Sequence, residues 1–223
     1  MKKYIIILLI LITGFSSFSQ TNPDNVNVIN YDISINEIDF SADSITAKTD
    51  LKLSVFNPSD QIDLHLLHLN PDSVKTNNQN LTYSYNDTIL SIDLPSQISS
   101  QDTITLSVYY NGSPVTDPSG WGGFYFSNNY AYNLGVGFDD VPHNYGRVWF
   151  PCVDNFTDRA SYNFHITTDS NKTAVCNGIN TTIDSLPNGD IVYHWELTHE
   201  IPTYLASLAV GEYVKYEYTY QGI

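Results

Sequence analysis

Residues 104–112, ITLSVYYNG, alternate apolar with polar side chains and end on the turn-forming pair Asn111-Gly112. A period of two is typical of a β-strand with one buried face and one wet face. The same alternation recurs on both sides of this stretch, at residues 31–35, 51–55, 62–66, 90–94, 162–166, 191–197 and 205–216. Turn signals separate these stretches, and no segment has the period of an amphipathic helix. The sequence therefore predicts an all-β fold of large twisted antiparallel sheets or a sandwich.

The chain is acidic, with 24 Asp and Glu against 9 Lys and Arg in 223 residues, a formal charge of −15. This charge argues against a nucleic-acid partner, because phosphate backbones select basic patches. It argues equally against electrostatic docking on anionic membranes. Hydrophobic residues make up 42% of the chain, which is enough for a packed core and excludes a disordered protein.

The first residues have the pattern of a secretory signal peptide. Lys2-Lys3 is followed by an apolar run over residues 4–12 and by small residues at Ser17 and Ser19. The run is too short to span a bilayer, so we expect residues 1–19 to be cleaved and the mature chain to have no transmembrane segment. Residues 20–29 would form a short lead before the β-domain. Without Lys2 and Lys3 the chain has 7 basic and 24 acidic residues, a charge of −17.

The two cysteines, Cys152 and Cys176, each lie next to a predicted strand. In an exported protein they could form a disulfide, and they could equally remain two separate buried thiols. The sparse cysteines and the short signal peptide are typical of a bacterial protein of the periplasm or cell surface.

The residues supply no catalytic machinery and no metal site. His65 and His68 would point to opposite faces of a strand. Residues 199–203, HEIPT, begin like the metalloprotease motif His-Glu-x-x-His but have Thr203 in place of the second histidine. His165 and His194 have no ligand-spaced partners and are expected to face solvent. Serine-nucleophile and phosphate-binding motifs are absent as well.

Glycine and aromatic residues dominate the region between residues 114 and 151, which includes SGWGGFYF at 119–126 and GVGFDD at 135–140. A sheet corner and a functional cleft both explain this texture. The adjacent acids Asp139 and Asp140 could bind a cation or an amine, although a solvated surface explains them too.

Residues 146–154, GRVWFPCVD, resemble the Ala-Arg-x-x-Phe-Pro-Cys-x-Asp-Glu-Pro signature of the aminopeptidase N family of zinc metallopeptidases. Further similarities occur in the family's order, at residues 123–125, 159–164, 174–178 and 203–211. The residues that match family motifs, and for which we expect a structural role, are Gly123, Phe124, Tyr125, Arg147, Phe150, Pro151, Cys152, Asp154, Tyr204 and Leu205. Arg147 and Asp154 carry opposite charges and could pair, fixing the bend at Phe150-Pro151.

The resemblance implies the saddle-like N-terminal β-domain of that family over residues 30–223, cut off before the catalytic domain. Zinc is expected in that missing domain, and no cofactor in this chain. The comparable stretch of the family carries a Gln that helps to hold the substrate's free α-amino group. Here Gly137 is its counterpart and cannot do so, whereas Asp139 or Asp140 could accept an ammonium group. The candidate cleft residues are therefore Gly137, Phe138, Asp139 and Asp140.

The implied function is that of a cleft-capping domain in an exported metallo-aminopeptidase-like protein. Its partners would be its own catalytic domain and peptide substrates, and the chain alone should be inactive. A non-catalytic peptide- or protein-binding scaffold of the same ancestry is the alternative. An adhesion or glycan-binding module, suggested by the Tyr, Trp and Asn content, is a third.

Overall fold

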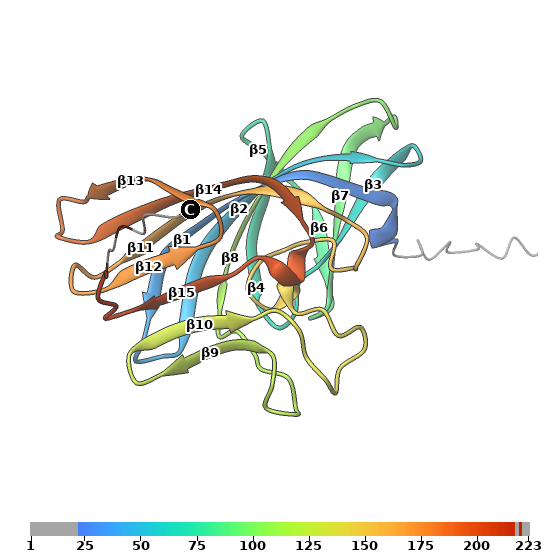
Figure 1. Ribbon diagram of the computed structural model, residues 1–223. Helices are drawn as coiled ribbons and strands as arrows, with labels where there is room; N and C mark the ends of the chain where they lie inside the picture. Colours follow the sequence, from blue (N-terminus) through green and yellow to red (C-terminus); the bar gives the residue numbers. More distant parts are fainter. Residues whose placement is uncertain (1–21, 217–218, 220–223) are drawn as a thin grey trace, which may run out of the picture.

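The computed structural model describes residues 22–216 and residue 219 (Figure 1). The expected signal peptide at residues 1–19 lies outside the described residues. Within them the chain forms β-strands and three single 3-10 turns, η1 (Pro23–Asn25), η2 (Gly146–Val148) and η3 (Thr203–Leu205). In this part of the chain no helix is long and apolar enough to cross a membrane.

The largest sheet has eight strands and runs the length of the molecule in Figure 1. Its strands lie in the order β13 (Ile179–Ser185), β14 (Ile191–Ile201), β11 (Ala160–Thr168), β1 (Val26–Asp39), β2 (Ser44–Val55), β8 (Ile104–Gly112), β4 (Asn70–Thr76) and β5 (Gln79–Leu81). Strand β1 begins inside the lead that the sequence predicted for residues 20–29.

Two smaller sheets complete the fold. The first has four strands, in the order β12 (Thr173–Cys176), β15 (Leu208–Gly211), β10 (Tyr130–Leu134) and β9 (Gly123–Ser127). The second has three, in the order β3 (Ser59–His65), β7 (Ile89–Ile98) and β6 (Tyr83–Tyr85). In Figure 1 the β9–β10 hairpin lies below the large sheet, and the three-stranded sheet lies at the end away from β13.

Alternation along the strands sorts the side chains between core and solvent, as β11 shows. Its residues alternate without a break between buried and half-buried positions. Side chains of successive strand residues point to opposite faces, so this pattern commits one face of the large sheet to the core. Aromatic rings fill the centre: Tyr31 stacks on Tyr162 with centroids 5.1 Å apart and meets Phe150 edge-on at 5.3 Å.

The all-β prediction is confirmed, and the stretches from residue 31 to residue 197 that showed the alternation fall on β1, β2, β3, β7, β8, β11 and β14. The last predicted strand, over residues 205–216, is shorter in the structure and runs over Leu208–Gly211. One pairing departs from the expected antiparallel sheets, because β1 and β11 are parallel, with Ile33 opposite Phe164. Alternation marks which face of a strand is buried but carries no information on strand direction.

Several short strands were missed. The pair Asn70-Pro71 is one of the turn signals between the alternating stretches, but in the structure it begins β4, where a register shift between Pro71 and Ser73 accommodates the proline. The edge strand β13 is almost wholly exposed, so no apolar alternation reveals it.

A buried acid next to β1 makes stability depend on pH. The Asp158 side chain accepts a hydrogen bond from the Val28 amide at 3.2 Å through one oxygen, and the other oxygen has no protein partner. Burial raises the pKa of Asp158 from 3.8 to about 6. The folded state therefore binds a proton more tightly than the unfolded chain, and this group lowers stability as pH rises from about 4 to about 6.

We predict that Asp158→Asn removes this contribution while keeping an oxygen for the Val28 amide. Relative to the variant, the unaltered chain should lose on the order of 2 kcal/mol of unfolding free energy between pH 4 and pH 7. Urea unfolding at a series of pH values measures the difference. Parallel stability curves for the two proteins would contradict the prediction.

Candidate functional site

Arg147 occupies the centre of the 146–154 motif and is buried, with 4% of its surface exposed. Its guanidinium donates to the carbonyl oxygens of Asn144 and Pro142, the latter at 3.1 Å. It also forms an ion pair with Asp154 at 3.3 Å. The opposite charges noted in the sequence are therefore in contact, and the backbone between them turns through η2.

Asp154 is the second residue of the motif that contacts several other segments of the chain. One carboxylate oxygen accepts from the Arg147 amide at 3.1 Å, and the other accepts from the Thr203 hydroxyl at 2.5 Å. The Asp154 amide donates to Nδ1 of His65 at 3.1 Å. Burial lowers the pKa of His65, which favours the neutral ring that this acceptor role requires. One aspartate thus connects η2, η3 and the end of β3.

The apolar residues of the motif join the sheets to one another. Cys152 exchanges backbone hydrogen bonds with His65, at 2.7 and 2.9 Å. The Val153 amide donates to the Tyr31 hydroxyl of β1 at 3.1 Å, and the Tyr110 hydroxyl of β8 donates to the Trp149 carbonyl at 2.9 Å. Phe150 and Pro151 are buried at the same point. The motif therefore anchors the three-stranded sheet to the large sheet.

The loops on either side of β9 and β10 converge on the carboxylate of Asp117, which is 2% exposed. It accepts from the amide and hydroxyl of Ser119 and from the amides of Asp139 and Asp140 at 3.2 and 3.0 Å, and it lies 3.1 Å from the Tyr145 hydroxyl. Burial acts to raise the pKa of Asp117, but these donors outweigh it and hold the pKa well below its ordinary value. We call Asp117, Gly137, Asp139, Asp140 and Tyr145 the loop cluster.

The loop cluster is tied to the motif through Asp140 and Tyr145. The Tyr145 hydroxyl lies 2.6 Å from a carboxylate oxygen of Asp140, and the Arg147 guanidinium lies 4.0 Å from that carboxylate. Burial and then the two neighbouring carboxylates raise the pKa of Tyr145 well above its ordinary value, so the phenol keeps its proton and donates. The position of the loops thus depends on the buried arginine.

Three of the four predicted cleft residues belong to the loop cluster and Phe138 lies between them, but the four differ in what they present. Gly137 has no room for a side chain, since a Cβ would collide with the Asp117 carboxylate and the Tyr145 ring. Phe138 is 64% exposed and stacks on Trp121 with ring centroids 6.3 Å apart. The Asp139 side chain is exposed, whereas Asp140 is half-buried against Tyr145 and Arg147.

The other motif residues make contacts that hold the loops and strands of the domain in place. Gly123 has φ +104°, and a Cβ there would collide with the backbone of Val115. Phe124 is buried, and the Tyr125 hydroxyl donates to the Gly122 carbonyl at 2.9 Å. Tyr204 and Leu205 lie in η3, where Tyr204 meets Phe156 edge-on at 5.5 Å.

Asp117 and Tyr145 belong to the site although no sequence motif marks them as members. The segment 117–120, DPSG, carries a signal, because Asp two residues before Ser is typical of a side chain that caps its own turn. That signal predicts a turn but not the more distant donors at residues 139, 140 and 145.

Cys152 and Cys176 are both free and buried, so the disulfide that the sequence left open does not form in the structure. The reason is topological: Cys152 bridges to His65 of β3, whereas Cys176 pairs with Leu208 of β15 in another sheet. Burial raises the pKa of both thiols well above its ordinary value, which makes them poor nucleophiles.

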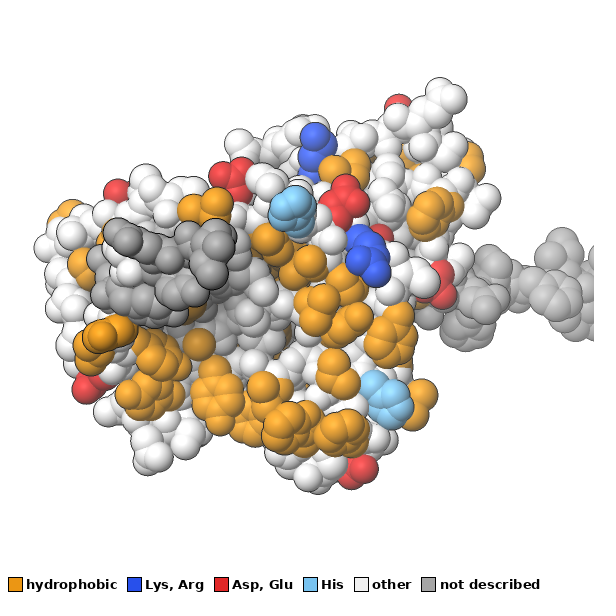
Figure 2. Space-filling view, in the orientation of Figure 1, with side chains coloured by type: hydrophobic (Ala, Val, Ile, Leu, Met, Phe, Trp, Pro, Cys, Tyr) orange, Lys and Arg blue, Asp and Glu red, His pale blue; other side chains and the backbone are white. Residues whose placement is uncertain are grey.

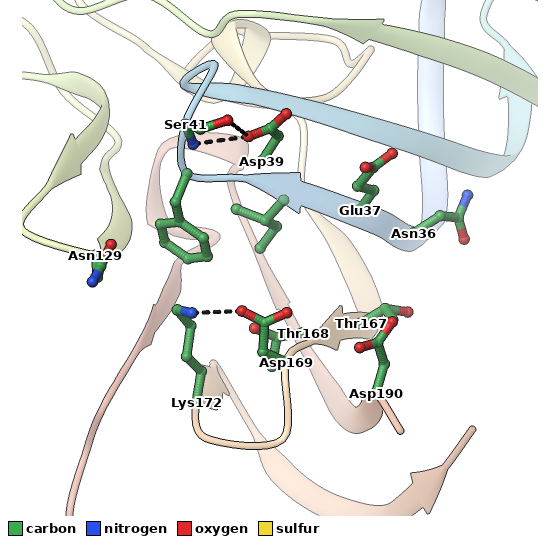
Figure 3. A pocket seen from close by; sticks show the side chains of 12 residues that line it. Asn36, Glu37, Asp39, Ser41, Asn129, Thr167, Thr168, Asp169, Lys172 and Asp190 are labelled. Atoms are coloured by element: carbon green, nitrogen blue, oxygen red, sulfur yellow. Dashed lines mark hydrogen bonds and ion pairs between the residues drawn. The ribbon is translucent and has the colours of Figure 1, made fainter. Parts of the chain in front are cut away.

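A polar hollow of about 630 Å³ lies between the β1–β2 turn and the β11–β12 turn (Figure 3). Figure 3 shows Asp39 and Ser41 on one side and Lys172 paired with Asp169 at 2.7 Å on the other. Lys172 also lies over the Phe40 ring, 4.5 Å from its centroid. Lys172 is already paired with Asp169, and Asp39 accepts hydrogen bonds from the amide and hydroxyl of Ser41, so the loop cluster remains the stronger candidate site.

Within the described residues, no group of three or more His, Cys, Asp or Glu side chains is arranged to hold a metal ion. The sequence predicted that His65 and His68 lie on one strand, but they do not. His65 ends β3, where its ring accepts from the Asp154 amide, and His68 lies beyond the strand with a left-handed backbone at φ 56°.

Sheet order and motif together define an all-β domain in which a buried Arg–Asp pair organises loops at one side of a large mixed sheet. Residues 27–205 match the family model described as the peptidase M1 N-terminal domain. The chain belongs to this family, which confirms the resemblance seen in the sequence.

Solved structures share the fold. One is a mutant M1 zinc metallopeptidase from Deinococcus radiodurans bound to a Tyr-Ser-Ala substrate, with a TM-score of 0.76 and 23% identity over 84% of this chain and 42% of that one. A second structure of the Deinococcus radiodurans M1 zinc metallopeptidase has a TM-score of 0.75 and 22% identity, with the same coverage. The chain thus spans less than half of these proteins.

A further similarity covers a shorter stretch of the chain. Transcription initiation factor TFIID subunit 2 of Drosophila melanogaster is 31% identical over 82 residues, which is 35% of this chain and 7% of that protein.

We predict that Asp154→Ala destabilises the chain by about 3–5 kcal/mol, because it leaves the buried Arg147 charge unpaired. The matched control is Lys48→Ala, which breaks the shorter but partly exposed 2.8 Å pair with Asp50 and should cost about 0–1 kcal/mol. Chemical denaturation of both variants measures the two losses. Equal losses would show that the buried pair has no special weight.

The free thiols give a chemical prediction. In the native chain both should react very slowly with a disulfide-exchange reagent, and in denaturant without reductant two thiols per chain should react at once. Absence of reactive thiols in the denatured, unreduced protein would establish a disulfide instead.

Proposed function

We propose that this domain caps the substrate cleft of a zinc metallopeptidase whose catalytic domain lies outside this chain, in a protein exported to the periplasm or cell surface. Membership of the peptidase M1 N-terminal domain family carries the proposal. Zinc hydrolysis needs three protein ligands and an open water position, and the chain has no His-Glu-x-x-His motif to begin such a set. The catalytic domain would supply the zinc.

Exposed hydrophobic side chains support a second domain as neighbour. Trp121, Phe138, Phe156 and Leu205 are each between 48% and 64% exposed. Phe138 stacks on Trp121, Phe156 contacts Tyr204, and the Tyr204 backbone packs against Gly135, which shortly precedes Phe138. Figure 2 shows hydrophobic side chains gathered on the face that carries β10 and η3. Exposed apolar surface of this kind is typical of an interface.

The acids of the loop cluster suit the amino end of a peptide. Asp139 is exposed beside the Phe138–Trp121 stack, and the amides of Asp139 and Asp140 are fixed by Asp117. A carboxylate held on a rigid loop attracts an ammonium group without first having to be ordered. Because Gly137 leaves no side chain there, this recognition would depend on Asp139, with Asp140 more restrained by Tyr145.

A non-catalytic scaffold is the second candidate. The similarity to a transcription initiation factor subunit shows that a related segment occurs in a protein whose name describes no peptidase. Fold alone does not carry chemistry, so the same apolar face could bind a protein that is not a peptidase domain.

We predict that the isolated chain shows no chelator-sensitive hydrolysis of aminoacyl-p-nitroanilides. The gene downstream of Ile223 should encode His-Glu-x-x-His and a later Glu, and the longer product should hydrolyse these substrates.

In that longer product, Asp139→Asn should raise KM for peptides with a free amino group and leave kcat largely unchanged. Ser127→Ala, an exposed substitution on β9, serves as the control.

Two results would overturn the proposal. Zinc-dependent hydrolysis by the isolated chain would place the chemistry here. A downstream sequence that continues without those zinc ligands would remove the peptidase and favour the scaffold.

A further inference from the structure

Two histidines lie directly opposite one another on neighbouring strands of the large sheet. His165 of β11 is the register partner of His194 of β14. Both occupy the polar face, where their side chains are 33% and 23% exposed. A register shift in β13 next to His194, between Asn180 and Thr182, marks a β-bulge at this point. Such bulges re-aim side chains and are frequent beside functional sites.

The two rings converge through the same atom. Nδ1 of His165 lies 2.6 Å from Nδ1 of His194, and the rings meet edge-on at 61°. The far nitrogens are both backed by acids: Nε2 of His165 lies 3.1 Å from Asp32 on β1, and Nε2 of His194 lies 3.1 Å from Asp184 on β13. The row Asp32–His165–His194–Asp184 thus crosses four adjacent strands.

Hydrogen-bond chemistry fixes where the protons are. A carboxylate can only accept, so each Nε2 carries the hydrogen that it donates to its aspartate. In neutral rings both Nδ1 atoms then hold bare lone pairs, and these lone pairs face each other across 2.6 Å. Such an arrangement is stable only with an electrophile between the nitrogens, either a shared proton or a metal ion.

We propose that His165 and His194 bind one late transition-metal dication of the Zn²⁺ class through their Nδ1 atoms, with water completing the coordination. Imidazole nitrogen suits such ions. Zn–N bonds of about 2.0–2.1 Å at a tetrahedral angle separate the two nitrogens by about 3.3 Å, so the rings need to open by about 0.7 Å. Their partial exposure permits this movement and leaves a path for the ion.

The two aspartates act as positioning residues. Metal-bound histidines characteristically donate their second nitrogen to a carboxylate, which fixes the tautomer and makes the ring a better ligand. A shared proton would use the same two acceptors, because the ring that accepts it at Nδ1 carries its own hydrogen on Nε2. The titration below distinguishes the two occupants. On the neighbouring strand β2, Asp50 is the register partner of Asp32 and forms an ion pair with Lys48. This pair adds no net charge to the row.

Calorimetric titration of the full chain, purified without a histidine tag, with ZnCl₂ tests the proposal. One ion should bind per chain, and MgCl₂, which prefers oxygen ligands, should give no heat. His165→Ala and His194→Ala should each weaken Zn²⁺ binding at least tenfold. Asp184→Asn should weaken it by about tenfold. His199→Ala, on the same strand β14 but exposed and outside the row, is the matched control and should bind as the unaltered chain does.

Protection from diethyl pyrocarbonate, mapped by mass spectrometry, gives a measurement that needs no variant. Zn²⁺ should protect His165 and His194 and leave His199 reactive, even where an alanine variant fails to fold. The proposal is overturned if the unaltered chain takes up no Zn²⁺ at millimolar concentration, which would assign the contact to a shared proton. It is also overturned if His199→Ala weakens binding as much as His165→Ala does.

Discussion

The buried ion pair between Arg147 and Asp154 is the constraint on which the rest of the structure depends. A guanidinium inside a protein must be neutralised and must satisfy its donors, and here one carboxylate and two carbonyls do so. The same carboxylate accepts from Thr203, and its backbone reaches His65. The short turns η2 and η3 and the end of β3 are therefore connected at one charged centre.

This centre also determines how firmly the loops are held. Arg147 approaches Asp140, Asp140 accepts from Tyr145, and Tyr145 shares Asp117 with two loop amides. Glycine at 137 lets these groups meet, since any side chain there would separate them. The solvent-facing side chains of Phe138 and Asp139 are thus attached to a loop whose backbone is held in place by these hydrogen bonds. Rigid display lowers the entropy cost of binding a peptide end or a neighbouring domain.

The sequence was informative where a local pattern carried the information. Alternation located the long strands, and the 146–154 motif pointed to the Arg147–Asp154 pair. Alternation failed for β13, which buries almost nothing, and for the parallel alignment of β1 with β11. The contact between His165 and His194 could not be predicted for a related reason. Residues 165 and 194 become neighbours only through strand register, which long-range pairing decides and which no spacing in the sequence reveals.

The parallel pairing of β1 with β11 has a consequence for the order of events during synthesis. Strand β1 can form its hairpin with β2 early, but its other edge stays open until residues 160–168 have been made. Pairing between such distant segments is slow, because a long loop must close first. The nascent chain therefore passes through a period with an unsatisfied strand edge, during which a chaperone that binds extended segments would find its target.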